Sequence, residues 1–356
     1  MRTPVQVDPA RLQLAFDRVQ ESVQKQEVPC AVLAVANSQS TLRCQAFSRE
    51  GGDQVRPDSI FMLASISKPI LATAVMQLVE DGLLVLSDPI TRYIPECAQP
   101  GKPPITAWNL LTHTSGMEEM AWWEALTMSG APREAYLQAA CRSNLHFVPG
   151  TRYEYCTLSF FILAELITRL SGLPYPEYLR QRIFDPLGMK DTSFDPGPRN
   201  ERAAPVHNFY PDPALAETAF RRWVALAVPG GGLWSTAADL IAFGQAYLNG
   251  GRHGGYHLLA PATIELMTRE HTTGLVELVE GRPQPAHYGL GWSKGSLRGT
   301  LPGSPRAFEH SGATGTLLWI DPEWDLVFVF LTNQWGAEDH ARLSALQTVY
   351  SALRPG

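Results

Sequence analysis

The sequence predicts an α/β (α+β) fold, in which one antiparallel sheet is flanked by helices and a mostly helical subdomain is inserted. Short apolar runs typical of strands are concentrated at the two ends of the chain, at 30–36 and 41–47 and again at 316–320 and 326–331. Between about 85 and 191 the pattern is mostly helical, with loops between the helical stretches. We therefore expect both chain ends to contribute strands to one sheet, with the helical part between them in the sequence.

The order of the elements follows from local patterns. Residues 9–26 are expected to form an amphipathic helix, because Leu12, Phe16 and further apolar residues recur near the helical period. The polar residues 37–40 separate the first two apolar runs and predict a hairpin. A last helix over about 340–353 closes the chain.

This order predicts how the chain is divided. We expect an α/β domain made of residues 1–84 and 215–356, and an inserted helical subdomain at 85–214. Two stretches rich in Pro and Gly, about 195–213 and 281–305, are expected to be long surface loops.

The composition is that of a large globular protein. The chain has 356 residues, of which 45% are hydrophobic and 18% are charged. Its net charge of −6 and the lack of a Lys- or Arg-rich run argue against nucleic acid and anionic membranes as partners. No apolar stretch reaches the ~18 residues that a membrane span needs. Residues 1–16 carry no apolar core of a secretory signal, so we expect a cytoplasmic protein.

The cysteines and histidines indicate neither a disulfide framework nor a metal site. The number of cysteines is odd and no Cys-x-x-Cys pair occurs, which is typical of free thiols in a reducing compartment. The nine histidines show no His-Glu-x-x-His pattern, and we expect neither a metal nor another cofactor. The cysteines are Cys30, Cys44, Cys97, Cys141 and Cys156.

The most informative short motif is Ser65-Ile66-Ser67-Lys68. Residues three apart on a helix face the same side, so the Ser65 hydroxyl and the Lys68 amine can come within hydrogen-bond reach. A serine needs a neighbouring base to become a nucleophile, and a buried lysine can be that base when burial keeps it partly neutral. Pro69 is tolerated only in the first turn of a helix, which predicts a helix start near Ser65.

Tyr155, like Tyr153 two residues before it, is a candidate partner of this pair. It follows the turn at Pro149-Gly150 and directly precedes an apolar helical stretch. A phenol held against an ammonium group can transfer protons. Alternatively, the tyrosine packs and donates a single hydrogen bond, and the spacing alone leaves both readings open.

A third cluster, 309–315, contains His310, Gly312 and Ala313 just before a predicted strand. Small residues there would let a substrate approach the strand, and an exposed N–H could complete an oxyanion hole. The alternative is a strand start softened by glycine, with an ordinary surface histidine. The cluster by itself does not decide between them.

Together the three clusters resemble the serine β-lactamase and penicillin-binding-protein superfamily, and more specifically its class C-like branch with the family VIII carboxylesterases. The resemblance lies in the order and approximate spacing of Ser65-x-x-Lys68, Tyr155-Cys156-Thr157 and His310-Ser311-Gly312. Further stretches that fit are 111–116, 186–189, 231–240 and 288–292. The resemblance covers about 28–333 and implies a β-lactamase/transpeptidase-like fold, with the site between the sheet and the helical subdomain.

The resemblance also implies roles for individual residues. Ser65 looks like the acylated nucleophile, Lys68 like its base and Tyr155 like a second proton-handling group. The backbone N–H groups of Ser65 and Ala313 would form the oxyanion hole.

Two positions depart from the family pattern. Thr157 stands where asparagine is usual, and a hydroxyl is shorter than an amide, which puts the usual contact with Lys68 in doubt. His310 stands where many relatives have lysine, so a permanent cation is replaced by a group that titrates near neutrality. Gly312 keeps the strand open. Both departures argue against a dedicated β-lactamase.

The predicted function is therefore hydrolysis of short- to medium-chain carboxylic esters through an acyl-enzyme on Ser65, with a small-molecule ester as partner. Alternatives within the superfamily are a β-lactamase, a D-amino-acid peptidase or an acyltransferase. An alternative of another class is a non-catalytic binding relative, which Thr157 keeps open. The oligomeric state is left open.

The loop around 111–128 carries two weaker signals. His113 is expected to order this loop by hydrogen bonds and not to take part in catalysis. An apolar patch that follows could form a wall for an acyl or alcohol group, or could simply pack within the subdomain. The patch consists of Met117, Met120, Trp122, Trp123, Leu126 and Met128.

Overall fold

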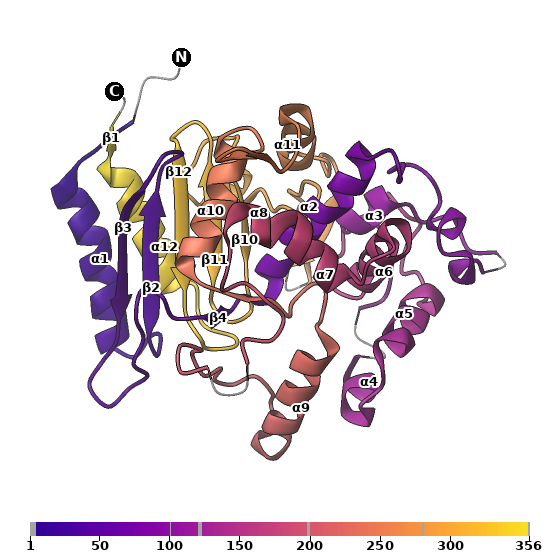
Figure 1. The fold of residues 1–356 in the computed structure, drawn as a ribbon, viewed down its shortest axis with the longest axis horizontal. Helices are drawn as coiled ribbons and strands as arrows, with labels where there is room; N and C mark the ends of the chain where they lie inside the picture. The colour runs from indigo at the N-terminus through magenta and orange to yellow at the C-terminus, as the bar shows by residue number, and fades with distance from the viewer. Residues whose placement is uncertain (1–4, 100, 120–122, 198–199, 280, 355–356) are drawn as a thin grey trace.

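The computed structural model describes residues 5–99, 101–119, 123–197, 200–279 and 281–354. Its centre is a five-stranded antiparallel sheet in the order β10-β11-β12-β2-β3 (Figure 1). The strands are β2 (Ala31–Ala36), β3 (Thr41–Phe47), β10 (Phe308–Ser311), β11 (Leu317–Asp321) and β12 (Leu326–Leu331). The prediction of one antiparallel sheet built from both chain ends is confirmed, including the hairpin of β2 and β3.

One face of the sheet is covered by the two ends of the chain. Side chains alternate between the faces of a strand, and those of Leu33 and Phe328 point to the same buried cluster as α1 (Pro9–Gln24) and α12 (His340–Ala352). Both helices lie where the sequence predicts them. Figure 1 shows them together at one side of the molecule, next to both termini.

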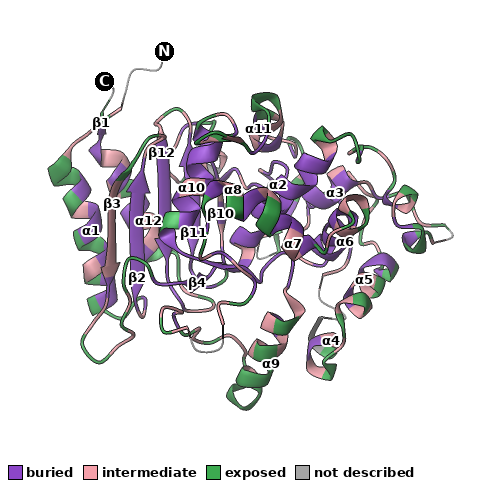
Figure 2. Ribbon diagram, viewed as in Figure 1, coloured by how far each residue is buried: buried purple, intermediate pink, exposed green. Residues whose placement is uncertain are grey.

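The other face of the sheet packs against the rest of the molecule. Val32 and Val329 belong to a second, larger buried cluster that includes α2 (Ser67–Glu80) and α10 (Ala237–Leu248). Because both faces are covered, β2 and β12 are buried along their whole lengths (Figure 2). The helix that follows Ser65 is thereby fixed between the sheet and the helical region.

The helical region occupies the side of the molecule away from α1 (Figure 1). Its helices are α3 (Ala107–Leu111), α4 (Trp123–Ser129), α5 (Arg133–Arg142), α6 (Ser159–Ser171), α7 (Tyr175–Leu179) and α8 (Asp185–Leu187). Later helices are α9 (Pro213–Leu226) and α11 (Pro261–Thr268). The division at 84/85 and 214/215 stays a prediction.

Short strands and single helical turns complete the fold. The paired short strands are β1 (Gln6–Val7) with β13 (Leu353–Arg354), β4 (Phe61–Met62) with β5 (Trp234–Ser235), and β6 (Arg252–His253) with β7 (Tyr256–His257). The turns are η1 (Ala64–Ile66), η2 (Ile90–Arg92), η3 (Pro95–Cys97), η4 (Arg180–Phe184) and η5 (Gly295–Arg298).

One stretch predicted as loop contains a strand of a two-stranded sheet. Within 281–305, β9 (Arg282–Pro285) pairs with β8 (Val276–Val279) in a separate two-stranded sheet. Proline cannot donate to a ladder and is confined to edge positions, and in a two-stranded sheet both strands are edges. Pro283 and Pro285 are therefore compatible with a strand here.

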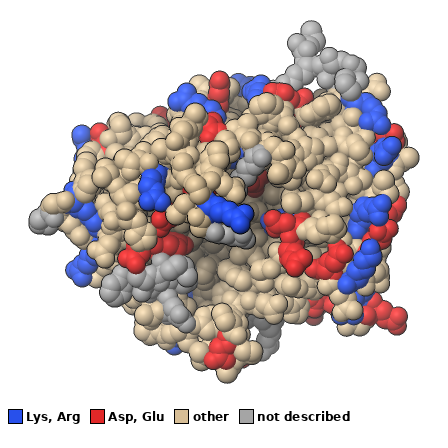
Figure 3. All heavy atoms as spheres, turned by 180° about the vertical axis from the view of Figure 1, so that it is seen from behind, with Lys and Arg blue, Asp and Glu red and all other residues tan. Residues whose placement is uncertain are grey.

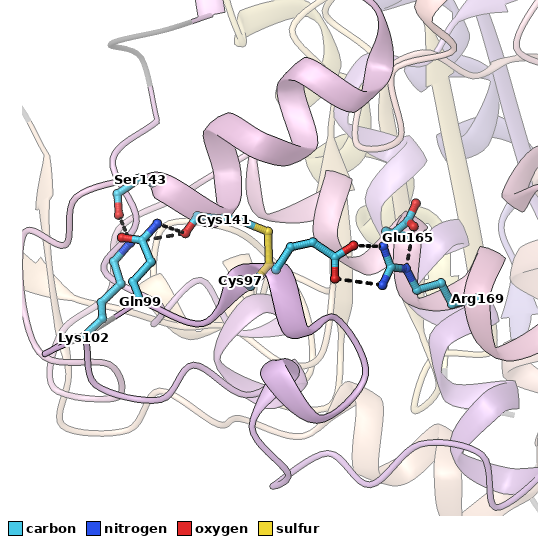
Figure 4. The surroundings of a disulfide bond; sticks show 8 residues. Cys97, Gln99, Lys102, Cys141, Ser143, Glu165 and Arg169 are labelled. Carbon is cyan, nitrogen blue, oxygen red and sulfur yellow. Dashed lines mark hydrogen bonds and ion pairs between the residues drawn. A yellow bond between two sulfur atoms is a disulfide. The ribbon is translucent and has the colours of Figure 1, made fainter.

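The prediction that all cysteines are free thiols is wrong for two of them. Cys97 at the end of η3 and Cys141 in α5 form a disulfide, with their Cα atoms 4.4 Å apart (Figure 4). The fold brings together two residues separated by 44 positions, a proximity that the Cys spacing does not show. The argument for a reducing compartment loses its basis. The other three, Cys30, Cys44 and Cys156, are free.

Within the described part of the chain, no helix combines the length and apolar character required to cross a bilayer. On the face drawn in Figure 3, the coloured Lys and Arg side chains alternate with Asp and Glu and do not gather into one basic patch. The same view shows a hollow near the middle of this face.

Candidate active site

Ser65 lies in a tight turn between a short strand and a helix. β4 leads into η1, and α2 begins directly afterwards at Ser67, so that Pro69 falls in the first turn as predicted. Ala64 adopts a φ of +47°, a left-handed conformation that is uncommon for a residue with a side chain. Backbone strain of this kind is often found at functional sites. Ser65, the next residue, is half-buried.

Lys68 is fully buried, and its ammonium group is surrounded by neutral oxygen atoms. Nζ donates hydrogen bonds to Ser65 Oγ at 3.2 Å, to Thr157 Oγ1 at 3.2 Å and to the Gly230 carbonyl at 2.9 Å. The ring of Tyr155 lies with its centroid 4.6 Å from the same Nζ. The predicted pairing of Ser65 with Lys68 is therefore present in the structure.

Burial lowers the pKa of Lys68 to about 8, while the charge of Glu119 raises it. Among the described residues, no carboxylate accepts a hydrogen bond from Nζ. The desolvation of the ammonium group therefore outweighs its attraction to the Glu119 carboxylate. Below its pKa the amine is mostly charged, and above it the amine is mostly neutral. Lys68 can therefore accept a proton from Ser65 in a growing fraction of molecules as the pH rises.

Tyr155 contacts the same serine. A side-chain hydrogen bond with Ser65 lowers its pKa, but burial raises that pKa more strongly, well above the usual value. Tyr155 is 36% exposed and lines the cleft described below, so water screens part of this effect. The phenol is thus neutral at physiological pH and can pass on a proton. Ser65, Lys68 and Tyr155 converge as the sequence motifs predict.

Thr157 makes the contact that the sequence left in doubt. Its Oγ1 accepts the hydrogen bond from Lys68, so the hydroxyl takes over this role from the longer amide usual at this position. Thr157 lies two residues after Tyr155 and two residues before the first residue of α6.

The end of β10 is bound tightly to the Ser65 turn. Thr314 Oγ1 donates to the Met62 carbonyl at 2.7 Å, and Thr316 Oγ1 donates to the Leu63 carbonyl at 3.0 Å. At Gly312, an added Cβ would lie 2.2 Å from the same Leu63 oxygen. Glycine is therefore required for the close approach. It places Ala313 in the wall of the cleft that also contains Ser65.

His310 belongs to a buried chain of hydrogen bonds. His113 Nδ1 accepts from the Cys156 N–H at 3.0 Å, so His113 carries its proton on Nε2, which lies 3.2 Å from Tyr288 Oη. His310 Nδ1 lies 2.8 Å from the Ser311 carbonyl and must donate to it. The Tyr288 hydroxyl then donates to His310 Nε2 at 3.0 Å. Every member has one donor and one acceptor role.

The expectation that His310 titrates near neutrality is wrong, because this histidine is buried within the hydrogen-bonded series His113-Tyr288-His310. Burial, followed by the nearby charge of Lys68, lowers the pKa of His310 to about 3. Burial likewise holds the pKa of His113 well below its usual value. Both imidazoles are neutral. The His113 side chain makes its hydrogen bonds with the Cys156 N–H and with Tyr288, which lie in two distant segments, and its role in ordering its own loop stays a prediction.

Several of these groups line one cleft of about 690 Å³, whereas Lys68 and Thr157 are not among its lining residues. Ser65, Tyr155, His310, Gly312 and Ala313 all contribute to its wall. A larger hollow of about 1070 Å³ lies between the loop after Asp195 and α9, but none of these residues lines it.

Three residues that contact the candidate active site were not predicted from the sequence. Gly230, Tyr288 and Glu119 reach the site through the tertiary fold, and only the first two lie in or beside stretches that match the superfamily. Of the apolar patch, Met120, Trp122 and the Trp123 side chain lie outside the described residues, and Met117 is buried.

Comparison with known proteins identifies the family of this chain. The family model described as Beta-lactamase matches residues 16–350. The chain belongs to the Beta-lactamase family. This confirms the resemblance found in the sequence and identifies the chain as a member of a family of serine hydrolases.

Relatives within the Beta-lactamase family differ in what they do. Esterase EstB of Burkholderia gladioli is 31% identical over 57% of this chain and 56% of its own length. The D-alanyl-D-alanine-carboxypeptidase/endopeptidase AmpH of Escherichia coli (strain K12) is 30% identical over 62% of this chain and 57% of its own. The solved structure of EstCE1, a hydrolase with promiscuous acyltransferase activity, matches with a TM-score of 0.79 at 21% identity, over 96% of this chain and 99% of that one. This last likeness supports the β-lactamase/transpeptidase-like fold.

Proposed function

We propose that this protein hydrolyses short- to medium-chain carboxylic esters through an acyl-enzyme on Ser65. The observation that carries the proposal is the convergence of Lys68 and Tyr155 on the hydroxyl of Ser65, a residue in the wall of the cleft. In each half-reaction a hydroxyl must lose a proton while it attacks a carbonyl carbon. The neutral form of Lys68 receives that proton, and Tyr155 passes a proton to the leaving alkoxide.

The tetrahedral intermediate carries a negative oxygen that needs two donors. The backbone N–H groups of Ser65 and Ala313 are the proposed oxyanion hole. The Thr314 and Thr316 hydrogen bonds support this assignment, because they hold the two segments against each other. In deacylation, water takes the place of the Ser65 hydroxyl and the same pair removes its proton.

The charges around the cleft support a neutral ester as substrate. His310 is neutral and both of its ring nitrogens are engaged, so it supplies no cation for a substrate carboxylate. Arg342 is the one Lys or Arg among the described residues that line the cleft, and it is paired with Asp339. Three carboxylates line the same cleft: that of Asp339, which is paired with Arg342, and those of Glu277 and Glu309. An anionic substrate is therefore disfavoured.

Three substrates test the assignment. p-Nitrophenyl butyrate, a chromogenic cephalosporin and a D-alanyl amide represent an ester, a β-lactam and a peptide substrate. We expect the largest kcat/KM for the ester and its loss in Ser65→Ala. Faster turnover of the cephalosporin or the amide would contradict the proposal, and formation of a new ester from an added alcohol would indicate an acyltransferase.

A further inference from the structure

Glu119 reaches the site from the loop between α3 and α4. Its Oε2 accepts hydrogen bonds from the backbone N–H of Thr157 and, at 3.2 Å, from that of Leu158. These amides precede the first turn of α6, where Leu158, the capping residue, makes no side-chain cap bond. The positive end of a helix dipole favours a carboxylate at this place.

Thr157 connects this carboxylate to Lys68. Its N–H donates to Glu119, and its Oγ1 accepts from the Lys68 ammonium. One residue is thus held through its main chain by an anion and through its side chain by a cation. A change in the position of Glu119 must displace a direct contact of Lys68.

Glu119 is also the charge that matters most for Lys68. The other titratable groups that face this lysine are Tyr155, Cys156, His113 and His310. Burial raises the pKa of the Tyr155 phenol and of the Cys156 thiol and lowers those of the two imidazoles, so all four are neutral near pH 7.

We propose that Glu119 is a positioning residue of the site, which fixes Thr157 and Leu158 through two backbone hydrogen bonds and sets the charge state of Lys68 from the far side of Thr157. This inference rests on the proposed function, since it concerns the same Ser65 chemistry. Because the carboxylate stabilises the ammonium form, it restricts the neutral base to higher pH.

The loop that carries Glu119 is itself anchored. The Glu118 N–H lies 2.9 Å from Ser143 Oγ and 3.2 Å from the Asn144 carbonyl, and the His146 N–H donates to the Gly116 carbonyl. Ser143 follows closely after Cys141, which forms the disulfide with Cys97, and Lys102 donates to the carbonyl groups of both Cys141 and Ser143 (Figure 4). These contacts hold the loop that carries Glu119 close to the start of α6.

The test separates charge from hydrogen bonding. Glu119→Gln keeps an acceptor oxygen for the two N–H groups and removes the charge. Glu118→Gln is the matched control, since it removes the same charge one residue earlier on a loop held there by its main chain. The readout is the second-order rate of Ser65 labelling by a fluorophosphonate, measured against pH in the full-length protein.

In Glu119→Gln we expect the acid limb of this profile to move to lower pH by roughly half a unit, so that the rate near pH 6, relative to the plateau, rises about threefold. Glu118→Gln should move it by less than about a third of that shift. An unchanged or upward-shifted limb in Glu119→Gln would overturn the proposal. Absence of Ser65 labelling in the wild-type protein would instead refute the proposed function.

Two further variants test the proposal in the case that Glu119→Gln does not fold. Glu119→Ala removes both charge and acceptor, and it should show the same shift together with a lower plateau. Glu119→Asp keeps the charge and should restore the wild-type limb. If both charge-free variants failed to fold while Glu119→Asp folded, Glu119 would be a structural cap only, and the assignment to Lys68 would be wrong.

Discussion

The Nζ atom of Lys68 lies 3.2 Å from Ser65 Oγ, and each of the three hydrogen bonds that it donates goes to an uncharged oxygen atom. A fully buried ammonium group with no directly bonded carboxylate is destabilised more by the loss of hydration than it is stabilised by its neighbours. The catalytic proposal depends on this imbalance, because it makes the amine available as a base.

The pH dependence of activity follows from it. The pKa of Lys68 is lowered to about 8 and the neutral amine is the active form, so kcat/KM for p-nitrophenyl butyrate should rise with pH and level off above about 8. Lys68→Arg keeps a cation that does not deprotonate and should lower kcat/KM by at least roughly a hundredfold. A profile that is flat from about pH 6 to 9 would contradict the role of Lys68.

The chain of His113, Tyr288 and His310 predicts defined tautomers. Long-range ¹H–¹⁵N spectra should show His113 protonated on Nε2 and His310 on Nδ1, and His310 should stay neutral down to about pH 5, since its pKa is lowered to about 3. Tyr288→Phe leaves one buried donor and one buried acceptor without a partner, and should destabilise the protein by about 1–3 kcal/mol for each. Titration of His310 near its ordinary pKa would rule out this arrangement.

Gly312 should tolerate no side chain. Gly312→Ala would place a Cβ 2.2 Å from the Leu63 carbonyl, so β10 must move away from the Ser65 turn and the proposed oxyanion hole must widen. We expect kcat/KM to fall by roughly a hundredfold, the loss seen when one oxyanion donor is removed. Gly255→Ala, where no atom lies within 4 Å of the added Cβ, is the control and should behave as wild type. Equal activity of the two variants would exclude a role for the close approach.

The disulfide predicts a thiol count. The denatured, unreduced protein should react with three equivalents of a thiol reagent, at Cys30, Cys44 and Cys156, and with five after reduction. Closing a loop of 44 residues stabilises the folded state by about 4 kcal/mol in the chain-entropy estimate, so reduction should lower Tm markedly. Five reactive thiols before reduction would show that Cys97 and Cys141 are not bonded.

The parts of the site that the sequence predicts are those set by local geometry. Ser65 and Lys68 are one helical turn apart, and Pro69 marks where that helix begins, so their meeting requires no tertiary information. The strands of the central sheet are equally clear, because β2 and β12 are apolar throughout.

What the sequence could not show depends on distant segments meeting. Glu119 contacts Thr157 only through the tertiary fold, and nothing in the sequence around it indicates that its carboxylate lies near Lys68. The Cys97–Cys141 bond depends on the packing of η3 against α5. The neutrality of His310 follows from burial and from Tyr288, neither of which its motif reveals.

The most direct measurement of the central claim is the intact mass of the protein after reaction with a fluorophosphonate, followed by peptide mapping. The account predicts one adduct per chain, located on Ser65, together with loss of ester turnover in proportion to labelling. An adduct on any other residue, or full ester turnover in protein that the reagent leaves unlabelled, would contradict it.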